Sequence, residues 1–195
     1  MVKQFANALL LLIVLTLITG VGYPLLITGV AQALFPTQAN GSFLAKEGKL
    51  IGSSLIGQNF TKPEYFHGRP SAAGDDGYDA ANSSASNLGP TSEKLIKGIA
   101  VKAADFRTEN HLADDVKIPA DAVMASASGL DPDISIENAY LQAARIAAAR
   151  GISEDTVKSI INKQIEAPHL GGFKVNKVNV LNLNVALDGV SSNYP

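Results

Sequence analysis

The chain has 195 residues and a formal net charge of −2, and charged residues make up only 17% of it, below the roughly 25% usual for soluble domains. This deficit is local, because no charged residue lies between Lys3 and Lys46. The remainder of the chain carries 15 basic and 18 acidic residues. Because the basic residues form no basic face, nucleic acid is excluded as an expected partner. Cysteine is absent, which excludes disulfides and cysteine-ligated metal sites.

The first predicted element is a membrane-spanning helix. Residues 8–31 contain fourteen Leu, Ile or Val residues and no ionisable group. A helix of this length rises about 36 Å, enough to cross a hydrocarbon core of about 30 Å, and its branched apolar residues favour insertion by about 4–8 kcal/mol. We therefore predict a transmembrane anchor over residues 1–34 and a soluble domain over residues 35–195. Without ionisable groups at membrane depth, the helix anchors the chain and does not conduct ions.

The charges that flank this helix predict its orientation. Lys3 and the α-amino group precede it, and no charge follows it before Lys46. The positive-inside bias then places the N-terminus in the cytoplasm and the main domain outside the cytoplasmic membrane. The alternative is a cleavable secretory signal peptide, with a small-x-small site at Ala31 and Ala33. The apolar run exceeds the about 7–15 residues of such peptides, which favours the anchor.

Short strands and a long loop are predicted next. Residues 35–42 are polar and rich in turn-forming types, and residues 49–60 mix short apolar pairs with glycines, which predicts one or two short strands there. Gly, Pro, Ser, Asn and Asp dominate residues 62–90, so this segment is expected to be irregular. Loops of that length in a compact domain usually bind something or pack against a partner.

Three helices are predicted in the second half of the chain. Ser92, Ser135 and Ser153 each precede an apolar pattern of helical period and are expected to cap it. Gly151 is expected to end the second helix. The predicted apolar faces are Leu95, Ile99, Ala103 and Phe106 in the first helix, Ile136, Tyr140, Ala143 and Ala147 in the second, and Val157, Ile160, Ile161 and Ile165 in the third.

The last predicted element is a strand over residues 174–187. Apolar and polar residues alternate there, and the phase slips between Val180 and Leu181, which indicates a β-bulge. Together the elements predict a mixed α/β chain: one N-terminal transmembrane helix and a small α+β extracytoplasmic domain.

Motifs of catalysis and metal binding are missing from the sequence. There is no glycine-rich phosphate loop, no G-x-S-x-G and no DKTGT, so we predict no catalytic residues. The three histidines stand apart in sequence, and the acidic run at residues 74–79 lacks calcium-loop spacing, so no metal site is expected. Residues 147–153 resemble a helix-turn-helix, but Glu154, Asp155 and Glu166 disfavour DNA, so a structural helical hairpin is expected.

Several segments, in order along the chain, resemble the C subunit of Kdp-type potassium-transporting P-type ATPases. The matching segments are YPLL at 23–26, GSSLIGQNF at 52–60, YFHGRPSA at 65–72, SSASNLGPTS at 83–92, ASASGLDP at 125–132, ARG at 149–151 and VNVLNLN at 178–184.

The resemblance implies a multi-subunit complex in the bacterial cytoplasmic membrane. In it, a channel-like subunit binds potassium, a P-type subunit hydrolyses ATP, and a small single-span subunit accompanies them. The C subunit is then a non-catalytic accessory subunit without a cofactor of its own, which supports assembly and acts as a catalytic chaperone that raises the ATP affinity of the hydrolysing subunit. Membrane lipid is the further expected partner.

Two groups of residues are predicted to serve that role. The partner-interface candidates are Tyr65, Phe66, Arg69 and Pro70, because Arg and Tyr are favoured interface anchors. The resemblance also suggests a nucleotide-binding loop, whose candidates are Ser83, Ser84, Ser86, Asn87 and Gly89. The predicted orientation conflicts with this second group, because ATP is cytoplasmic and the loop is expected outside.

Two other functional classes compete with the accessory subunit. One is a membrane-anchored extracytoplasmic enzyme that uses the serine-rich loop, residues 83–89, and turnover of ester or phosphate substrates would favour it. The other is a ligand-binding module, which would be a monodisperse domain with a deep pocket and no companion subunits.

Overall fold

The computed structural model describes residues 1–46, 48–165 and 176–191. The chain forms two compact units, Met1–Ser53 and Ser54–Pro195, which are described in turn. Mixed helix and strand content and, among the described residues, one N-terminal helix apolar enough to span a membrane confirm that part of the predicted fold class, whereas the extracytoplasmic location of the domain stays a prediction. The assignment of residues 35–195 to one soluble domain stays a prediction.

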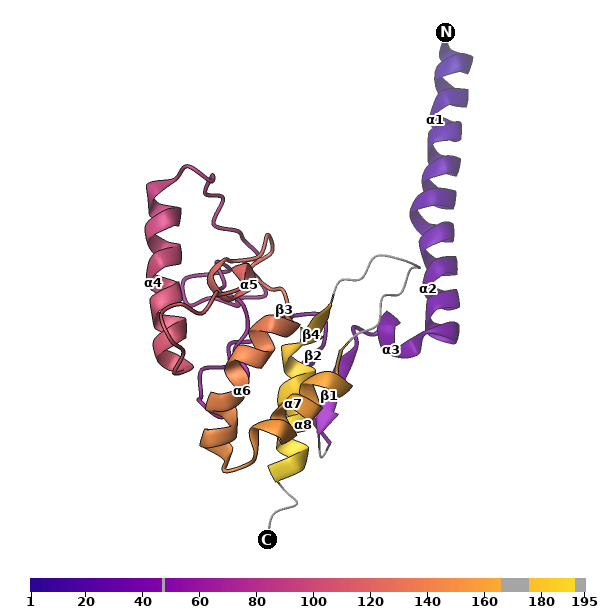
Figure 1. The fold of residues 1–195 in the computed structure, drawn as a ribbon. Coiled ribbons are helices and arrows are strands. Elements are labelled where there is room, and N and C mark those ends of the chain that lie inside the picture. Colours follow the sequence, from indigo (N-terminus) through magenta and orange to yellow (C-terminus); the bar gives the residue numbers. More distant parts are fainter. Residues whose placement is uncertain (47, 166–175, 192–195) are drawn as a thin grey trace. The chain divides into compact units, whose positions relative to one another are not determined.

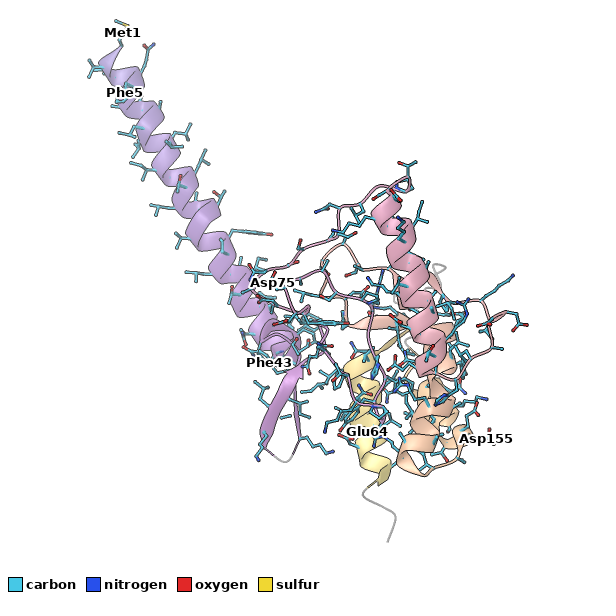
Figure 2. The ribbon with its side chains drawn as sticks, turned by 90° about the vertical axis from the view of Figure 1, so that its left-hand side faces the viewer. Met1, Phe5, Phe43, Glu64, Asp75 and Asp155 are labelled. Carbon is cyan, nitrogen blue, oxygen red and sulfur yellow. The ribbon has the colours of Figure 1, made fainter. Side chains whose placement is uncertain are left out.

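The first unit is dominated by one long helix. It consists of α1 (Val2–Leu17), a π-helical turn η1 (Ile18–Gly22) and α2 (Tyr23–Leu34), and over Val2–Leu34 it is long and apolar enough to cross a membrane. The side chains of its N-terminal part, around Met1 and Phe5, project outward from the ribbon (Figure 2), and none of the residues in its apolar stretch is buried. At the π turn, the Thr19 hydroxyl donates a hydrogen bond of 2.7 Å to the Leu15 carbonyl oxygen.

A short connection joins this helix to a β-hairpin. After α3 (Pro36–Ala39), strand β1 (Phe43–Lys46) pairs antiparallel with β2 (Lys49–Ser53), and the register shifts between Leu44 and Ala45. The side-chain amides of Gln32 and Asn40 exchange two hydrogen bonds of 3.1 Å and fix the turn between α2 and α3. The strand predicted within residues 49–60 is therefore β2, while its partner β1 was not predicted.

The second unit begins with a long irregular segment, residues 54–92, which contains neither helix nor strand. It includes residues 62–90, which were predicted to be irregular, and it leaves no second strand within residues 54–60. Helix α4 (Glu93–Glu109) follows and is capped by Ser92, whose hydroxyl accepts a bond from the Leu95 N–H. None of its residues is fully buried, and no other helix or strand in the described part of this unit covers its outer side (Figure 1). The predicted apolar face of α4 is only half-buried.

The helical hairpin that was predicted is present. Helix α5 (Ala120–Val123) and strand β3 (Asp133–Ser135) precede α6 (Ile136–Arg150), and α7 (Glu154–Lys163) packs against α6. The predicted caps Ser135 and Ser153 accept bonds from the backbone N–H groups of Asn138 and Thr156. Gly151 ends α6 in a left-handed conformation, with φ of 66°, which a glycine adopts without steric cost.

The predicted C-terminal strand is wrong over most of its described length. Strand β4 (Lys177–Asn179) pairs antiparallel with β3, and α8 (Val180–Ser191) follows at once. The phase slip at Val180 therefore marks the change from strand to helix, because Val180, Leu183 and Leu187 are all buried at helical spacing. The Asn179 side chain caps α8 by accepting a bond of 3.1 Å from the Asn182 N–H. Residues 174 and 175 lie outside the described part of the chain.

The apolar core of the second unit joins α6, α7, α8 and the strand pair. Its members are Phe66, Ile134, Ala139, Ala143, Ile146, Ala147, Val157, Ile160, Ile161, Val178, Val180, Leu183 and Leu187. Phe66 is the one member that comes from the irregular segment, so the core holds this segment against the helices.

Candidate functional site: a clamped loop beside α4

The contact loop, residues 62–70, is held by two side-chain amides. Asn184 of α8 accepts a bond from the Phe66 N–H at 2.8 Å and donates one to its carbonyl at 3.0 Å. Gln142 of α6 makes the same pair of bonds with His67, at 2.8 and 3.1 Å. Each amide supplies the two hydrogen bonds that a neighbouring antiparallel strand would supply. The loop thus satisfies buried backbone groups without joining a sheet.

A buried arginine lies beneath the same loop. The guanidinium of Arg145 donates to the carbonyls of Pro63 and Tyr65 at 2.5 and 3.0 Å. It also donates to the side-chain oxygens of Asn110 and Gln142, both at 2.9 Å. Burial lowers the pKa of Arg145, while the nearby Glu109 carboxylate acts in the opposite direction. Arginine nevertheless stays charged, and its fixed fork therefore determines the path of the loop.

The network continues away from the loop to α5. Gln142 Nε2 donates to Asn138 Oδ1 at 2.9 Å, and Asn138 Nδ2 donates to Asp121 Oδ2 at 2.9 Å. Sequence reasoning did not identify these residues as positioning groups. The available signal was spacing, because Asn138, Gln142 and Arg145 stand at positions i, i+4 and i+7 of one helix and so share a face.

Phe66 is placed in the core and not on the surface. Its side chain is 0% exposed, because Asn184 fixes its backbone and the ring packs among the apolar residues of the helices. Phe66 therefore holds the contact loop against the core and presents no side-chain surface to a partner.

Tyr65 is half-buried at another side of the loop. Its ring lies 5.6 Å from that of Phe60, and the guanidinium carbon of Arg150 lies 4.9 Å from its centroid, within the range of a cation–π contact. Arg150 is itself fixed by a 3.0 Å ion pair with Asp188. Burial and the Asp188 carboxylate raise the pKa of the Tyr65 hydroxyl. The ring is therefore held in one orientation by its own chain.

Arg69 and Pro70 line a pocket of about 410 Å³ between the loop and α4, which Tyr65 does not line. Arg69 Nη1 donates to Asp131 at 2.7 Å, and within the described chain its buried Nε has no hydrogen-bond partner. The Tyr78 hydroxyl donates to the Arg69 carbonyl at 2.6 Å. Burial, with a smaller contribution from Asp131, raises the pKa of Tyr78 to about 12. The pocket wall thus presents a partly exposed arginine on a fixed backbone.

The serine-rich loop lies apart from this pocket. Ser83 and Ser84 bond the Ser128 carbonyl, through a hydroxyl and a backbone N–H, both at 2.9 Å. Both serines line a shallow polar pocket with Asp75 and Asp79, and no basic residue is among its described lining. Ser86, Asn87 and Gly89 are exposed and do not line it. Acidic side chains repel phosphate groups, so this pocket does not suit the phosphates of a nucleotide.

Comparisons with known proteins match nearly the whole chain. The family model described as "KdpC: K+-transporting ATPase, c chain" matches residues 5–189. The potassium-transporting ATPase KdpC subunit of Mycobacterium tuberculosis (strain ATCC 25618 / H37Rv) is 53% identical over 186 residues, which covers 95% of this chain and 98% of that protein. The KdpC subunit of Caulobacter vibrioides (strain ATCC 19089 / CIP 103742 / CB 15) is 53% identical over 196 residues, with coverage of 100% and 96%. That of Gemmatimonas aurantiaca is 49% identical over 195 residues, with coverage of 100% and 97%.

Proposed function

Because the chain belongs to the KdpC family, the c chain of K⁺-transporting ATPases, we propose that it is a non-catalytic accessory subunit of an ATP-driven potassium uptake complex. The observation that carries this proposal is the match of the family model over residues 5–189, a range that covers nearly all of the apolar helix and the whole contact loop, residues 62–70. The motifs that mark a P-type ATPase catalytic subunit or a phosphate-binding loop are missing from the sequence, which supports an accessory role.

We propose that the helix Val2–Leu34 anchors this subunit in the bacterial cytoplasmic membrane. The length and apolar character of the helix support this placement. Lys3 in the first turn of the helix supports a cytoplasmic N-terminus and an extracytoplasmic second unit. A single introduced cysteine can report this orientation, because the chain has no native cysteine that would also react. With Ser84→Cys in intact cells, we expect a membrane-impermeant maleimide to react from outside. Reaction only after the membrane is opened would reverse the proposed orientation.

The partners proposed for this subunit are the channel-like potassium-binding subunit, the P-type ATP-hydrolysing subunit and a small single-span subunit, with lipid around the anchor. Tyr65, Arg69 and Pro70 are proposed to face the channel-like subunit, because they are partly exposed on a rigidly held loop. Such preorganised Arg and Tyr side chains suit an interface. Arg69→Ala and Tyr65→Ala are expected to reduce recovery of the partner subunits at least severalfold, whereas the exposed control Lys97→Ala is not. Full recovery with both variants would remove these residues from the interface.

The proposed effect on the complex is higher ATP affinity of the hydrolysing subunit. The experiment is potassium-dependent ATP hydrolysis by the complex purified with and without this chain. We expect loss of the chain to raise the ATP concentration needed for half-maximal hydrolysis or to abolish hydrolysis. Unchanged ATP dependence would contradict the chaperone role. The proposed effect does not require direct ATP contact by the candidates Ser83, Ser84, Ser86, Asn87 and Gly89, because acidic residues line the pocket at the first two, and exclusively outside labelling of Ser84→Cys would exclude such contact.

A further inference from the structure

The apolar helix contains the sequence LITGV twice, at residues 17–21 and 26–30. The first copy lies almost entirely within the π turn η1, whereas the second lies within the regular helix α2. Because the five side chains are the same, the neighbouring sequence causes this difference. Pro24 stands three residues after the first copy, and Ala33 stands at the matching place after the second. A proline inside a helix removes a backbone donor and disturbs the turn before it, so Pro24 accounts for the π turn.

The carbonyl of Thr19 has lost both of its helical donors. In a regular α-helix it would accept from the N–H of Tyr23, four residues later, but the Tyr23 N–H donates to the Ile18 carbonyl. In a π-helix the donor is the residue five positions later. That residue is Pro24, which has no N–H. In the second copy, by contrast, the matching carbonyl of Thr28 lies in regular α-helix.

No side chain of the same helix replaces the lost donor. The Thr19 hydroxyl donates at 2.7 Å to the Leu15 carbonyl oxygen, which lies one turn towards the N-terminus. Gln32, near the other end of the helix, bonds Asn40. Within the described helix Val2–Leu34, the Thr19 carbonyl therefore has no side-chain donor.

This carbonyl lies near the middle of the proposed membrane span. Thr19 stands close to the midpoint of the 33-residue helix Val2–Leu34, so at 1.5 Å per residue each end is about 25 Å away. Water is scarce at that depth, and a backbone acceptor without a partner is costly there. The missing donor is therefore expected to come from outside the chain.

The backbone around the Thr19 carbonyl is open to a neighbouring helix. Gly20 follows Thr19 directly and Gly22 lies in the same π turn, and neither has a side chain that could cover the backbone. Even an added Cβ would meet its nearest atom only at 3.9 Å for Gly20 and 3.7 Å for Gly22. Small residues let two membrane helices approach closely, so that a side chain of one can bond the other.

Three other sources of the donor fit less well. A bound water needs about 2–4 polar partners, which the apolar side chains around this carbonyl do not supply. An ionised side chain is costly at the centre of a bilayer. A second copy of this helix in parallel would bring its own Thr19 hydroxyl to the same depth, but that hydroxyl already donates to Leu15.

We propose that the Thr19 carbonyl accepts a hydrogen bond from an uncharged hydroxyl or amide side chain on a membrane-spanning helix of another subunit, which packs against the π turn at Gly20 and Gly22. This inference rests on the proposed function, which places the helix in a membrane beside other subunits. It adds the place on the helix where such a subunit binds and the chemical group that the subunit contributes.

Solid-state NMR of the full chain tests this bond directly. Carbonyl-¹³C threonine and ¹⁵N glycine label only two Thr–Gly peptide groups, at residues 19–20 and 28–29, and Thr28→Ser removes the second signal and so assigns both. A carbonyl ¹³C resonance moves downfield when the oxygen accepts a hydrogen bond. On going from the chain alone in lipid bilayers to the purified complex, we expect the Thr19 resonance to move downfield and that of Thr28 to stay.

The outcomes of this experiment separate the bond from the proposed function. Failure of the labelled chain to co-purify with other subunits would contradict the proposed function. In an assembled complex, an unchanged Thr19 resonance would overturn the inference alone. A Thr19 resonance that is already at its bonded position in the chain alone would assign the donor to water or to a second copy, and would also overturn it.

A proline variant tests the consequence for assembly. Pro24→Ala restores an N–H that the helix can use itself, so the donor of the other subunit loses its acceptor. When parent and variant chains with different tags compete in the same membranes, we expect the complex to contain about 3- to 20-fold more parent chain, the range for one hydrogen bond between membrane helices.

Pro36→Ala is the matched control. Pro36 begins α3, where a backbone N–H has no acceptor within the helix, so this variant is expected to compete equally with the parent. The inference is wrong if Pro24→Ala enters the complex as well as the parent chain does, or if Pro36→Ala is excluded to the same extent as Pro24→Ala.

Discussion

At the scale of single residues, the buried Arg145 is expected to contribute strongly to the stability of the second unit. Arg145→Met removes the donors to the Pro63 and Tyr65 carbonyls and to the side-chain oxygens of Asn110 and Gln142, two residues that are buried. We expect the free energy of unfolding of the second unit to fall by about 3–5 kcal/mol, the usual cost of removing one partner of a buried charged contact. Urea denaturation of the full chain in detergent measures this loss.

The control for that variant is an exposed ion pair. Lys97 contacts Glu93 at 2.6 Å, but the two side chains are 74% and 80% exposed. Lys97→Met is therefore expected to change the free energy of unfolding by less than about 1 kcal/mol. A loss for Arg145→Met no greater than that for Lys97→Met would show that the buried network does not hold the loop.

Alanine variants of Gly129 and Gly151 distinguish the effect of steric crowding from the effect of backbone strain. Their φ angles are 68° and 66°, but a Cβ at Gly129 would lie 2.5 Å from the Ser84 carbonyl oxygen, whereas at Gly151 it would meet no atom within 4 Å. Both Ala variants carry left-handed strain of about 1–2 kcal/mol. Overpacking adds about 1–3 kcal/mol at Gly129 alone. Equal losses in unfolding free energy would contradict the close approach of the serine-rich loop.

The raised pKa of the Tyr78 hydroxyl predicts that the second unit loses stability at alkaline pH. Its pKa is raised from 10.0 to about 12, so the neutral hydroxyl favours the folded state. That contribution is complete below about pH 10 and disappears as the pH rises through about 12. The difference in unfolding free energy between the parent and Tyr78→Phe is therefore expected to shrink across this range. A constant difference from about pH 8 to pH 12 would contradict the burial of this hydroxyl.

At the scale of elements, local signals predicted helix starts well and failed at the C-terminal segment. Ser92, Ser135 and Ser153 were identified because a cap and its helix are adjacent in sequence. The strand predicted over residues 174–187 is wrong because short apolar runs fit both the two-residue period of a strand and the 3.6-residue period of a helix. Tertiary packing decides between them, since Asn184 must reach the Phe66 backbone and Leu183 must face the core.

A matched pair of valines tests the helical state of α8. A strand with a bulge would bury Val180 and Val185 alike, whereas the helix leaves Val180 4% exposed and Val185 only half-buried. Val180→Ala is expected to cost about 2–3 kcal/mol of unfolding free energy and Val185→Ala less than about 1 kcal/mol. Equal losses would favour the strand.

At the scale of the whole molecule, the apolar helix and the family were both predictable, and the family match confirms the resemblance read from the motifs. The way in which the contact loop is held was not predictable, because its contacts join residues far apart in sequence, such as Phe66 with Asn184 and His67 with Glu109. Such pairs leave no local pattern. The side of the membrane on which the second unit lies also stays a prediction, since it depends on few charges.

We propose that this chain works as a subunit of a potassium-transporting ATPase. The most direct measurement is affinity purification of the tagged chain from native membranes in mild detergent, followed by mass-spectrometric identification of its companions. We predict stoichiometric recovery of a P-type ATP-hydrolysing subunit and a channel-like potassium-binding subunit. Recovery of the chain alone, or with unrelated proteins, under conditions that preserve other membrane complexes would contradict the account.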